Sequence, residues 1–352
     1  MPKVSIILVN YNGLRWLKLF LSRLLLTNYP EFEIVVVDNA SSDDSVHYLK
    51  ENFNVQVVNL QENKGFAVGN NIGAKHSTGR ILAFLNNDME VNSDWLMQAV
   101  IKLTLDNSIG LVQCKIMRYD RKDVIDCLGV SVDRYNLALR IGHGEVDQGQ
   151  YDDLKEIGAA DGGAMVIWKD LFERIGGFDS TYFMYGEDAD LCWRARLNGF
   201  KILPATSSIV YHVGSATSKL SSSGEWNPSP FFAFHLTKNY VYCWLKNFST
   251  KTILIYWPIV LFMVLGMSFF EVIRGRKVVG ISHLKGLIWN IRNLKLVLRE
   301  RRSIQRLRKT SHLNDDVFFV KNLIEDSTIF RSRIRTAQRR LKSNLKKIPG
   351  GR

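Results

Sequence analysis

Three acidic residues fall within four positions of the stretch FMYGEDADLCWRARLNGF, residues 183–200: Glu187, Asp188 and Asp190. Aromatic and other bulky side chains flank them, and ionised carboxylates are costly in such surroundings unless they are paired or take part in a reaction. Acidic residues are also favoured in the first turn of a helix, next to the positive end of the helix dipole. The stretch therefore has two interpretations, a helix start and a set of catalytic carboxylates.

Helical spacing separates the three acids. Asp190 and Arg194 lie four positions apart, so they can form an ion pair on one face of a helix. Asp188 has no such partner, because the residues three and four positions further on are Leu191 and Cys192. Asp188 is thus the acid with the weakest structural explanation. Partial burial among the neighbouring aromatic side chains should raise its pKa.

Two further groups of polar residues follow apolar runs that indicate buried strands. Asp38 ends the run EIVVVD, where a carboxylate commonly contacts a nucleotide, although an Asx turn that ends the strand is an equal alternative. Asn86, Asn87 and Asp88 end the run ILAFLNND. Oxygen ligands there can hold magnesium or manganese, which in turn binds a diphosphate. Turn chemistry alone also explains this short motif.

His212 and a stretch rich in asparagine and glycine complete the candidates. His212 follows the predicted strand SSIVY. A lone histidine is usually structural, and His212 becomes a candidate metal ligand if it lies near Asp88. Residues 62–79, ENKGFAVGNNIGAKHSTG, match neither the dinucleotide-binding fingerprint nor a phosphate-binding loop. This mismatch counts against a dehydrogenase or a kinase.

The elements that must position these residues alternate regularly through the first hundred positions. This alternation predicts an α/β fold with a mostly parallel sheet and helices on both faces, whose ligands bind beyond the carboxyl ends of the strands. Residues 133–157 are polar and contain glycine, which predicts a mobile loop. The patterns predict strands over 4–11, 33–39, 55–60, 80–88 and 109–117 and helices over 14–26, 43–51, 66–76 and 93–105.

The charge of the chain is concentrated near its end. The chain has 352 residues and a net charge of +13, but residues 271–352 carry 22 Lys and Arg against 6 Asp and Glu, a net charge of +16. Four cysteines show no metal-ligand spacing, which is typical of a reduced, cytosolic catalytic part. Basic segments such as RERRSIQRLRK leave a nucleic-acid-binding protein open as an alternative.

An apolar segment precedes the basic tail. Residues 252–270 contain no charged side chain, and 19 residues are near the minimum needed to span a bilayer. A buried core helix and a helix lying in the membrane interface are alternatives. Arg274, Arg276 and Lys277 follow at once, which favours contact with anionic lipid at the cytoplasmic side of the cell membrane, as a peripheral or single-pass protein.

Seven motifs taken in order closely resemble family 2 glycosyltransferases, and the nearest branch is the rhamnosyltransferase-like group. The resemblance covers about residues 1–220 and implies a GT-A fold, in which one α/β domain has a nucleotide-binding half and an acceptor half. The motifs are VSIILVNYNG, VVVDNASSD, NKGFAVGNNIG, FLNND, DGGAMVIWKDLFERIGGFD, FMYGEDADLCWRARLNG and VYHVGS.

The resemblance implies a role for each matching residue. Asp188 matches the general base, and Asp88 matches the acidic metal ligand, with His212 as a second ligand of Mn²⁺ or Mg²⁺. The family motif is often written DxD, and its first position is Asn86 here. Residues matching the nucleotide-sugar site are Asn10, Asp38, Asn63, Gly65, Asn87 and Asp88; those matching the acceptor side are Gly163, Glu187, Asp190, Trp193 and Arg194.

These residues together predict an inverting glycosyltransferase with three regions: a GT-A domain (1–225), an aromatic and apolar membrane-associating segment (226–273) and a basic, mostly helical tail (274–352). Its expected partners are a nucleotide-diphosphate sugar donor, a lipid-linked or other glycan acceptor and an anionic membrane surface, with no nucleic acid. A nucleotidyltransferase of the same fold matches poorly, because VNYNGLRWL lacks the expected glycine-rich loop. A non-catalytic relative stays open through Asn86. The sequence predicts no particular sugar or oligomeric state.

Overall fold

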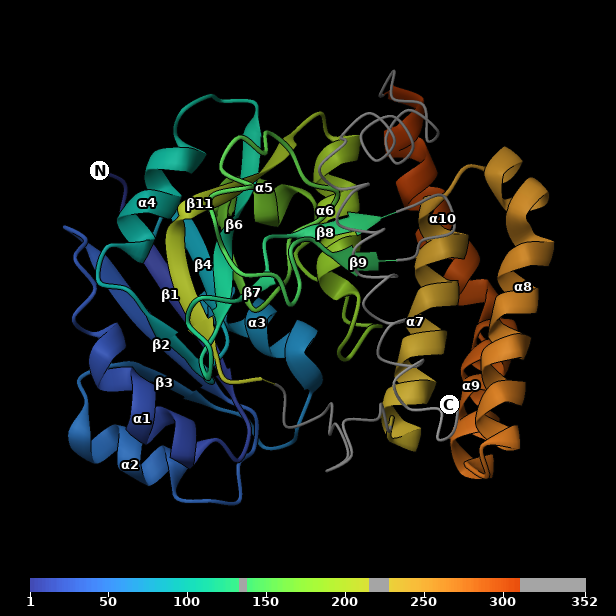
Figure 1. Cartoon of the computed structure of the whole chain (residues 1–352), viewed down its shortest axis with the longest axis horizontal. Coiled ribbons are helices and arrows are strands. Elements are labelled where there is room, and N and C mark those ends of the chain that lie inside the picture. Colours follow the sequence, from blue (N-terminus) through green and yellow to red (C-terminus); the bar gives the residue numbers. More distant parts are fainter. Residues whose placement is uncertain (133–137, 215–227, 311–352) are drawn as a thin grey trace, which may run out of the picture.

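The computed structural model describes residues 1–132, 138–214 and 228–310 (Figure 1). Within these ranges, nine strands form one sheet in the order β3-β2-β1-β4-β10-β6-β11-β5, with β7 paired to β6, and β8 and β9 form a separate hairpin. The strands are β1 (Val4–Asn10), β2 (Phe32–Asp38), β3 (Gln56–Asn59), β4 (Ile81–Leu85), β5 (Met89–Val91), β6 (Ile109–Arg118), β7 (Ile125–Cys127), β8 (Val130–Val132), β9 (Ala138–Arg140), β10 (Ala164–Trp168) and β11 (Lys201–His212).

Pairing is parallel through the first four strands of this order, and again between β6 and β11. β1 pairs in parallel with both β2 and β4, and β2 pairs in parallel with β3. β10 then runs antiparallel between β4 and β6, and β5 runs antiparallel to β11. The prediction of a mostly parallel sheet is therefore confirmed for β1 to β4, whereas the rest of the sheet is mixed, with antiparallel pairs on both sides of β10 and a parallel pair of β6 and β11. Because β10 is antiparallel, its first residues lie beside the last residues of β4.

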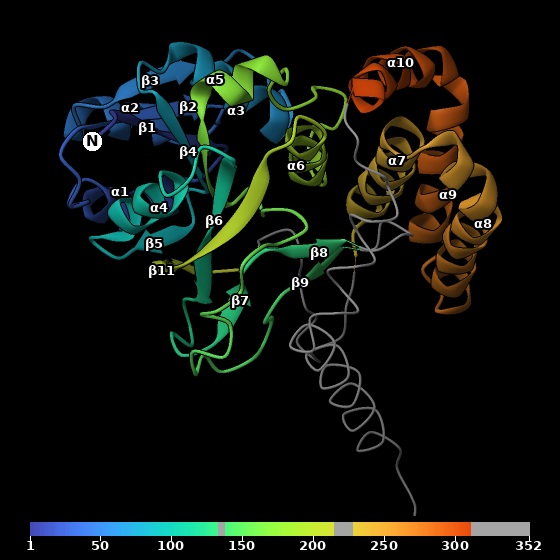
Figure 2. The same cartoon turned by 90° about the horizontal axis from the view of Figure 1, so that it is seen from above.

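Two apolar layers cover the two faces of the sheet (Figure 2). Alternating strand residues divide between the layers, with Ile81 and Ala83 facing one and Leu82 and Phe84 facing the other. The first layer includes α1 (Leu14–Leu24), α2 (Ser45–Asn52) and α4 (Trp95–Leu103); the second includes α3 (Gly65–His76), α5 (Lys169–Arg174) and α6 (Glu187–Leu197). Helices on both faces are as the sequence predicts.

The segment expected to be a mobile loop is packed where the structure describes it. Residues 141–157 have an irregular backbone, but Ile141, Tyr151 and Ile157 are buried in the core layer that also holds α3 and α6. These apolar residues are spaced without helical or strand periodicity, so the sequence pattern hides their burial. Residues 133–137 lie outside the described ranges.

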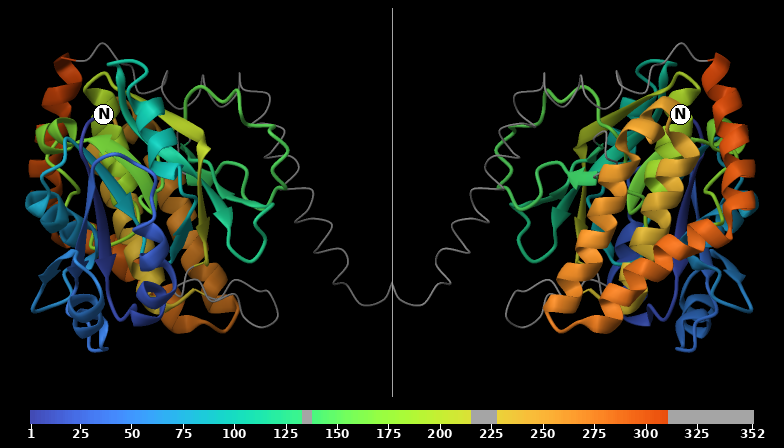
Figure 3. Two further views of the ribbon diagram at one scale, coloured as in Figure 1. Left: turned by 90° about the vertical axis from the view of Figure 1, so that its left-hand side faces the viewer. Right: turned by 90° about the vertical axis from the view of Figure 1, so that its right-hand side faces the viewer.

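Four helices form an extension beside α6 (Figure 3). α7 begins at a favourable signal, because Ser229 Oγ accepts a hydrogen bond from Phe232 N at 3.1 Å and Pro230 occupies the first turn. α7 packs against α6, α9 and α10, and α8 packs against α7 and α9. The helices are α7 (Pro230–Asn247), α8 (Thr250–Ile273), α9 (Lys277–Arg292) and α10 (Leu294–Thr310).

α8 contains the apolar segment noted in the sequence. In the described part of the chain it is the one helix long and apolar enough to cross a membrane, and only 17% of its most apolar stretch is buried. The predicted tail contains the helices α9 and α10, and its remainder at 311–352 lies outside the described ranges, so its mostly helical character stays a prediction. The predicted boundary at residue 225 also lies outside them.

Candidate active site

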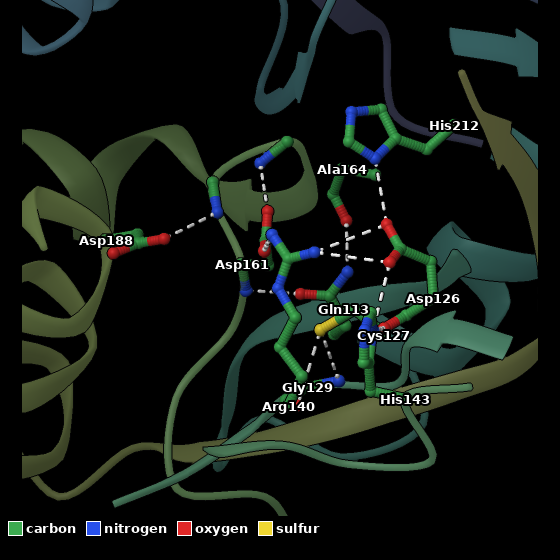
Figure 4. Close-up of polar contacts among 12 residues, drawn as sticks. Gln113, Asp126, Cys127, Gly129, Arg140, His143, Asp161, Ala164, Asp188 and His212 are labelled. Carbon is green, nitrogen blue, oxygen red and sulfur yellow. Dashed lines mark hydrogen bonds and ion pairs between the residues drawn. The ribbon is translucent and has the colours of Figure 1, made fainter. Parts of the chain in front are cut away.

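Asp188 is the second residue of α6. Gly186 directly precedes this helix, and its φ of 90° is suited to glycine. The carboxylate of Asp188 is part-buried, and its oxygens accept hydrogen bonds from Gly162 N at 2.9 Å and Ala189 N at 2.7 Å (Figure 4). The pKa of Asp188 is raised from 3.8 to about 6, first by burial and second by the negative charge of Asp161. The predicted rise in pKa is therefore confirmed, with Asp161 as a cause that the sequence did not indicate.

The loop Asp161–Gly163 joins Asp188 to the end of β4. Gly162 N donates to Asp188, and Gly163 O accepts a hydrogen bond from Asn86 N at 2.8 Å. A Cβ at position 163 would lie 2.9 Å from Met89 Cε and 3.1 Å from Asn86 Nδ2, both ends of side chains that would have to move. The backbone of these consecutive glycines thus connects the candidate base to the candidate metal motif.

His212 lies next to Asp88, as a metal role requires. The antiparallel register of β5 and β11 places His212 opposite Met89, and His212 Nε2 is 3.4 Å from Asp88 Oδ2. His212 Nδ1 is 2.8 Å from Asp126 Oδ2. Burial lowers the pKa of His212, but hydrogen bonds to Asp126 and Asp88 outweigh that effect and raise it to about 10.

The Asp88–His212 pair fits a divalent cation whose other coordination positions are filled by a bound substrate or by water. A carboxylate oxygen and an imidazole nitrogen are both acceptable to Mn²⁺, and a second carboxylate on the other ring nitrogen is the usual outer partner of a metal-binding histidine. Among the residues that the structure describes, no group of three or more His, Cys, Asp or Glu side chains is arranged to hold a metal ion. Phosphate oxygens and water would have to supply the remaining ligands.

Three charged residues that sequence reasoning missed connect the two halves of the site. Arg140 Nη1 is 3.3 Å from both oxygens of Asp126, and Arg140 Nη2 is 2.9 Å from Asp161 Oδ2. A chain of polar contacts therefore runs from Asp88 through His212, Asp126 and Arg140 to Asp161. Figure 4 shows the part of this chain from His212 to Asp161. Asp161 belongs to the motif DGGAMV, which was a usable signal, whereas Asp126 and Arg140 lie in segments without a recognisable pattern.

The predicted nucleotide residues meet at the carboxyl ends of β1, β2 and β4. Asn10 Nδ2 donates to Asp38 Oδ1 at 3.0 Å, and Asn87 Nδ2 donates to Asn10 Oδ1 at 2.7 Å. Asp38 is fully buried and also accepts hydrogen bonds from Ser41 N at 2.8 Å and Ser41 Oγ at 2.6 Å. These are the contacts of the Asx-turn alternative, so contact between Asp38 and a nucleoside stays a prediction.

Asn63 and Gly65 form the turn into α3, where Gly65 N donates to Asn63 Oδ1 at 2.9 Å. Gly65 has a φ of 82°, and a Cβ there would lie 2.4 Å from Phe183 O. Glycine at this position therefore lets the turn approach the loop that precedes Asp188. The predicted role of both residues in donor binding is not tested by these contacts.

The remaining residues of α6 are built into the protein interior. Arg194 Nε is 3.0 Å from Asp190 Oδ2, which confirms the predicted ion pair, and Trp193 stacks on Phe248 with ring centroids 4.8 Å apart. Glu187 is buried and has a pKa raised well above its usual value, first by burial and then by Asp188. Their predicted place on the acceptor side stays a prediction.

Comparisons with known proteins converge on one class. Residues 5–175 match the family model described as Glycosyl transferase family 2. Residues 155–214, which include Asp188 and His212, match a model described as the N-terminal domain of galactosyltransferase.

Two curated relatives show the same similarity at low identity. The O-antigen biosynthesis protein RfbC of Myxococcus xanthus is 26% identical over 271 residues, which are 70% of this chain and 21% of the relative. The low-salt glycan biosynthesis hexosyltransferase Agl10 of Haloferax volcanii is 27% identical over 203 residues, 56% of this chain and 63% of the relative. The chain thus spans less than two thirds of the length of these relatives.

Two solved structures share the fold. A crystal structure of GalNAc-T7 with UDP, GalNAc and Mn²⁺ matches with a TM-score of 0.56 and 20% identity, covering 73% of this chain and 50% of the other. The mannosyltransferase PcManGT of Pyrobaculum calidifontis, in complex with GDP-Man and Mn²⁺, matches with a TM-score of 0.51 and 16% identity, covering 93% and 88%. The expected GT-A architecture is confirmed, while the rhamnosyltransferase-like branch stays a prediction.

Proposed function

Because residues 5–175 of this chain belong to glycosyl transferase family 2, we propose that the protein transfers a sugar from a nucleoside-diphosphate sugar to a hydroxyl group of a glycan acceptor. One observation carries the proposal. Asp188 is a part-buried carboxylate with a pKa raised to about 6, and the loop 161–163 ties it to the Asn86–Asp88 motif. The family match and this geometry favour a catalyst over a nucleic-acid-binding protein, a nucleotidyltransferase or an inactive relative.

Asp188 acts as the general base. An acceptor hydroxyl is a poor nucleophile at neutral pH, so Asp188 takes its proton while the oxygen attacks the anomeric carbon. The bond from that carbon to the diphosphate oxygen breaks, and the electron pair leaves with the nucleoside diphosphate. A single displacement inverts the anomeric centre and needs no covalent sugar–enzyme intermediate.

Asp88 and His212 are the proposed protein ligands of a divalent cation, Mn²⁺ or Mg²⁺. The presence of Mn²⁺ in the two structural neighbours supports this assignment. When bound, such a cation offsets the negative charge that builds up on the leaving diphosphate. Asp126 holds the His212 ring by its other nitrogen, and this contact fixes the ring so that Nε2 faces Asp88.

The extension is proposed to hold the enzyme against the cytoplasmic side of a membrane, where a lipid-linked glycan acceptor would lie. Leu254, Phe262 and Phe269 on α8 are between 67% and 76% exposed, and the exposed basic residues Arg274 and Lys277 follow. Apolar side chains bordered by positive charge suit an anionic lipid surface. α9 packs along both α7 and α8, which favours a helix lying in the interface over a single span.

Vesicle sedimentation tests this attachment. The protein should sediment with phosphatidylcholine vesicles that contain phosphatidylglycerol, and Phe262→Asp should reduce the bound fraction. Leu26→Asp is the matched control, because Leu26 on the catalytic domain is 74% exposed. Equal binding of both variants would contradict the assigned surface.

The activity itself is tested by a screen of nucleotide sugars with and without Mn²⁺, followed by the Asp188→Asn variant. A binding donor should raise the melting temperature by mass action, and transfer to a glycan acceptor should follow. Asp188→Asn should reduce turnover by roughly 10²–10⁴-fold while leaving donor binding intact, because only the base is lost. Turnover like that of the wild type would refute the role of Asp188.

A further inference from the structure

The loop directly before Asp188 has a strained backbone. Phe183 and Tyr185 have φ values of 65° and 72°, and Gly186 follows with 90°. Left-handed backbone is expected at glycine but is a true outlier for large aromatic residues, and such strain persists only where surrounding structure enforces it. Two aromatic residues in this conformation, five and three positions before the candidate base, therefore require an explanation from their contacts.

One side chain of the helical extension contacts this loop at three points. Asn239 Nδ2, on α7, donates to the carbonyl oxygens of Tyr182 at 3.2 Å, Met184 at 2.7 Å and Tyr185 at 2.7 Å. Asn239 is 2% exposed, and its Oδ1 has no hydrogen-bond partner among the residues that the structure describes. The contacts of this side chain are thus made by its amide N–H groups, which donate to the carbonyl groups that the left-handed backbone turns toward α7.

The neighbouring residues of α7 contact the same loop. Lys238 Nζ donates to Thr181 O, the ring of His235 stacks on Phe183 with centroids 5.4 Å apart, and Phe232 meets Tyr185 edge to face. On the opposite side, Ala67 N donates to Phe183 O at 3.3 Å. The loop is therefore held between α7 and the start of α3.

We propose that Asn239 is a positioning residue for sugar transfer, whose amide holds the 182–186 loop in its strained form and so fixes Asp188 for proton abstraction. The inference rests on the proposed function for the identity of the reaction. Loss of the amide removes its hydrogen bonds to the carbonyl groups of Tyr182, Met184 and Tyr185, and the loop then relaxes toward ordinary backbone angles. A displacement of the base by about 1 Å is enough to cost roughly 10²-fold in rate.

Asn239→Ala should reduce kcat by roughly 10²-fold, as expected for a misplaced catalytic group. The donor affinity should stay within threefold of wild type, because most of the predicted donor residues lie at or just after the ends of β1, β2 and β4 and not on the loop; these are Asn10, Asp38, Asn87 and Asp88. Asn290→Ala is the matched control: Asn290 is also 2% exposed, and it donates to the backbone oxygens of Lys238 and Gly286 and not to the loop itself. It should lower the melting temperature and keep kcat per folded molecule.

Hydrogen exchange separates this inference from the proposed function, because it needs no activity. Amide exchange in residues 182–190 should become at least tenfold faster in Asn239→Ala and stay unchanged in Asn290→Ala. Asn239→Ser, which keeps one donor on a shorter side chain, replaces the alanine variant if the latter does not fold.

Unchanged exchange in the 182–190 segment, or a kcat within threefold of the Asn290→Ala control, would overturn the positioning role. A wild-type protein that transfers no sugar from any donor would refute the proposed function instead, while the exchange result would still decide whether Asn239 holds the loop.

Discussion

Replacing Asp161 with asparagine tests how Asp188 acquires its raised pKa. The pKa of Asp188 rises from 3.8 to about 6, with burial as the largest cause and the charge of Asp161 as the second. This rise is about 2 units, or ~3 kcal/mol of preference for the protonated form. In Asp161→Asn the side-chain oxygen can still accept the hydrogen bond from Gly163 N, which measures 2.9 Å, so the turn is kept while the charge is removed.

The expected change is a fall in the pKa of Asp188 by about 1 unit, which is ~1.4 kcal/mol. Arg140 contributes in the same direction, because its positive charge lowers the pKa of Asp188. In the variant Arg140 no longer pairs with a carboxylate at position 161, so its charge acts more strongly on Asp188. The base works as a carboxylate, so activity falls as pH drops through this pKa. The acid limb of kcat/KM should move from about pH 6 to about pH 5, and the relative rate at pH 5 should rise roughly fivefold.

The assay is the initial rate of sugar transfer against pH at constant ionic strength, with each variant scaled to its own plateau. Asp106→Asn serves as control, because Asp106 is exposed and precedes the start of β6, at the opposite end of the strands from the site. Its acid limb should match that of the wild type. An acid limb of Asp161→Asn that stays near pH 6, or moves to higher pH, would refute the assigned electrostatic coupling.

Three further outcomes are expected. Lys246→Met should destabilise the protein by about 3–5 kcal/mol in urea unfolding, because Lys246 Nζ lies 2.7 Å from Asp179 and 2.6 Å from Asp190 in the interior; a loss below ~1 kcal/mol would contradict this. Burial raises the pKa of Asp190, but Lys246 and Arg194 outweigh it and the net pKa is lowered. The resulting stabilisation is fully present at pH values above the ordinary pKa of 3.8, and it is lost as the pH falls from there through the folded pKa. The melting temperature should therefore stay constant from pH 7 to pH 5 and fall below about pH 4. An unchanged melting temperature below about pH 4 would argue against the network. His212→Ala should weaken Mn²⁺ binding in the presence of a nucleoside diphosphate by roughly 10–100-fold in calorimetric titration, and unchanged affinity would exclude His212 as a ligand.

Much of the architecture and part of the site follow from local sequence pattern. Strand and helix periodicity predicted the alternation from β1 to α4, and the four-residue spacing of Asp190 and Arg194 predicted an ion pair that the structure confirms. The same spacing singled out Asp188 by leaving it without a partner. These inferences succeed because helical and strand repeats report on neighbours within a few positions of the chain.

The rest of the site depends on contacts between residues far apart in the sequence. His212 meets Asp126 across 86 positions, Gly162 meets Asp188 across 26, and Asn239 meets Tyr185 across 54. Nothing in the local pattern around Asp126, Arg140 or Asn239 distinguishes them from ordinary surface or helix residues. Local pattern decides which segments are strands and helices. The antiparallel pairing of β10 between β4 and β6 and the packing of α7 against α6 decide which polar groups meet. The physical reason is that these groups are far apart in the sequence, so only the folded chain brings them together.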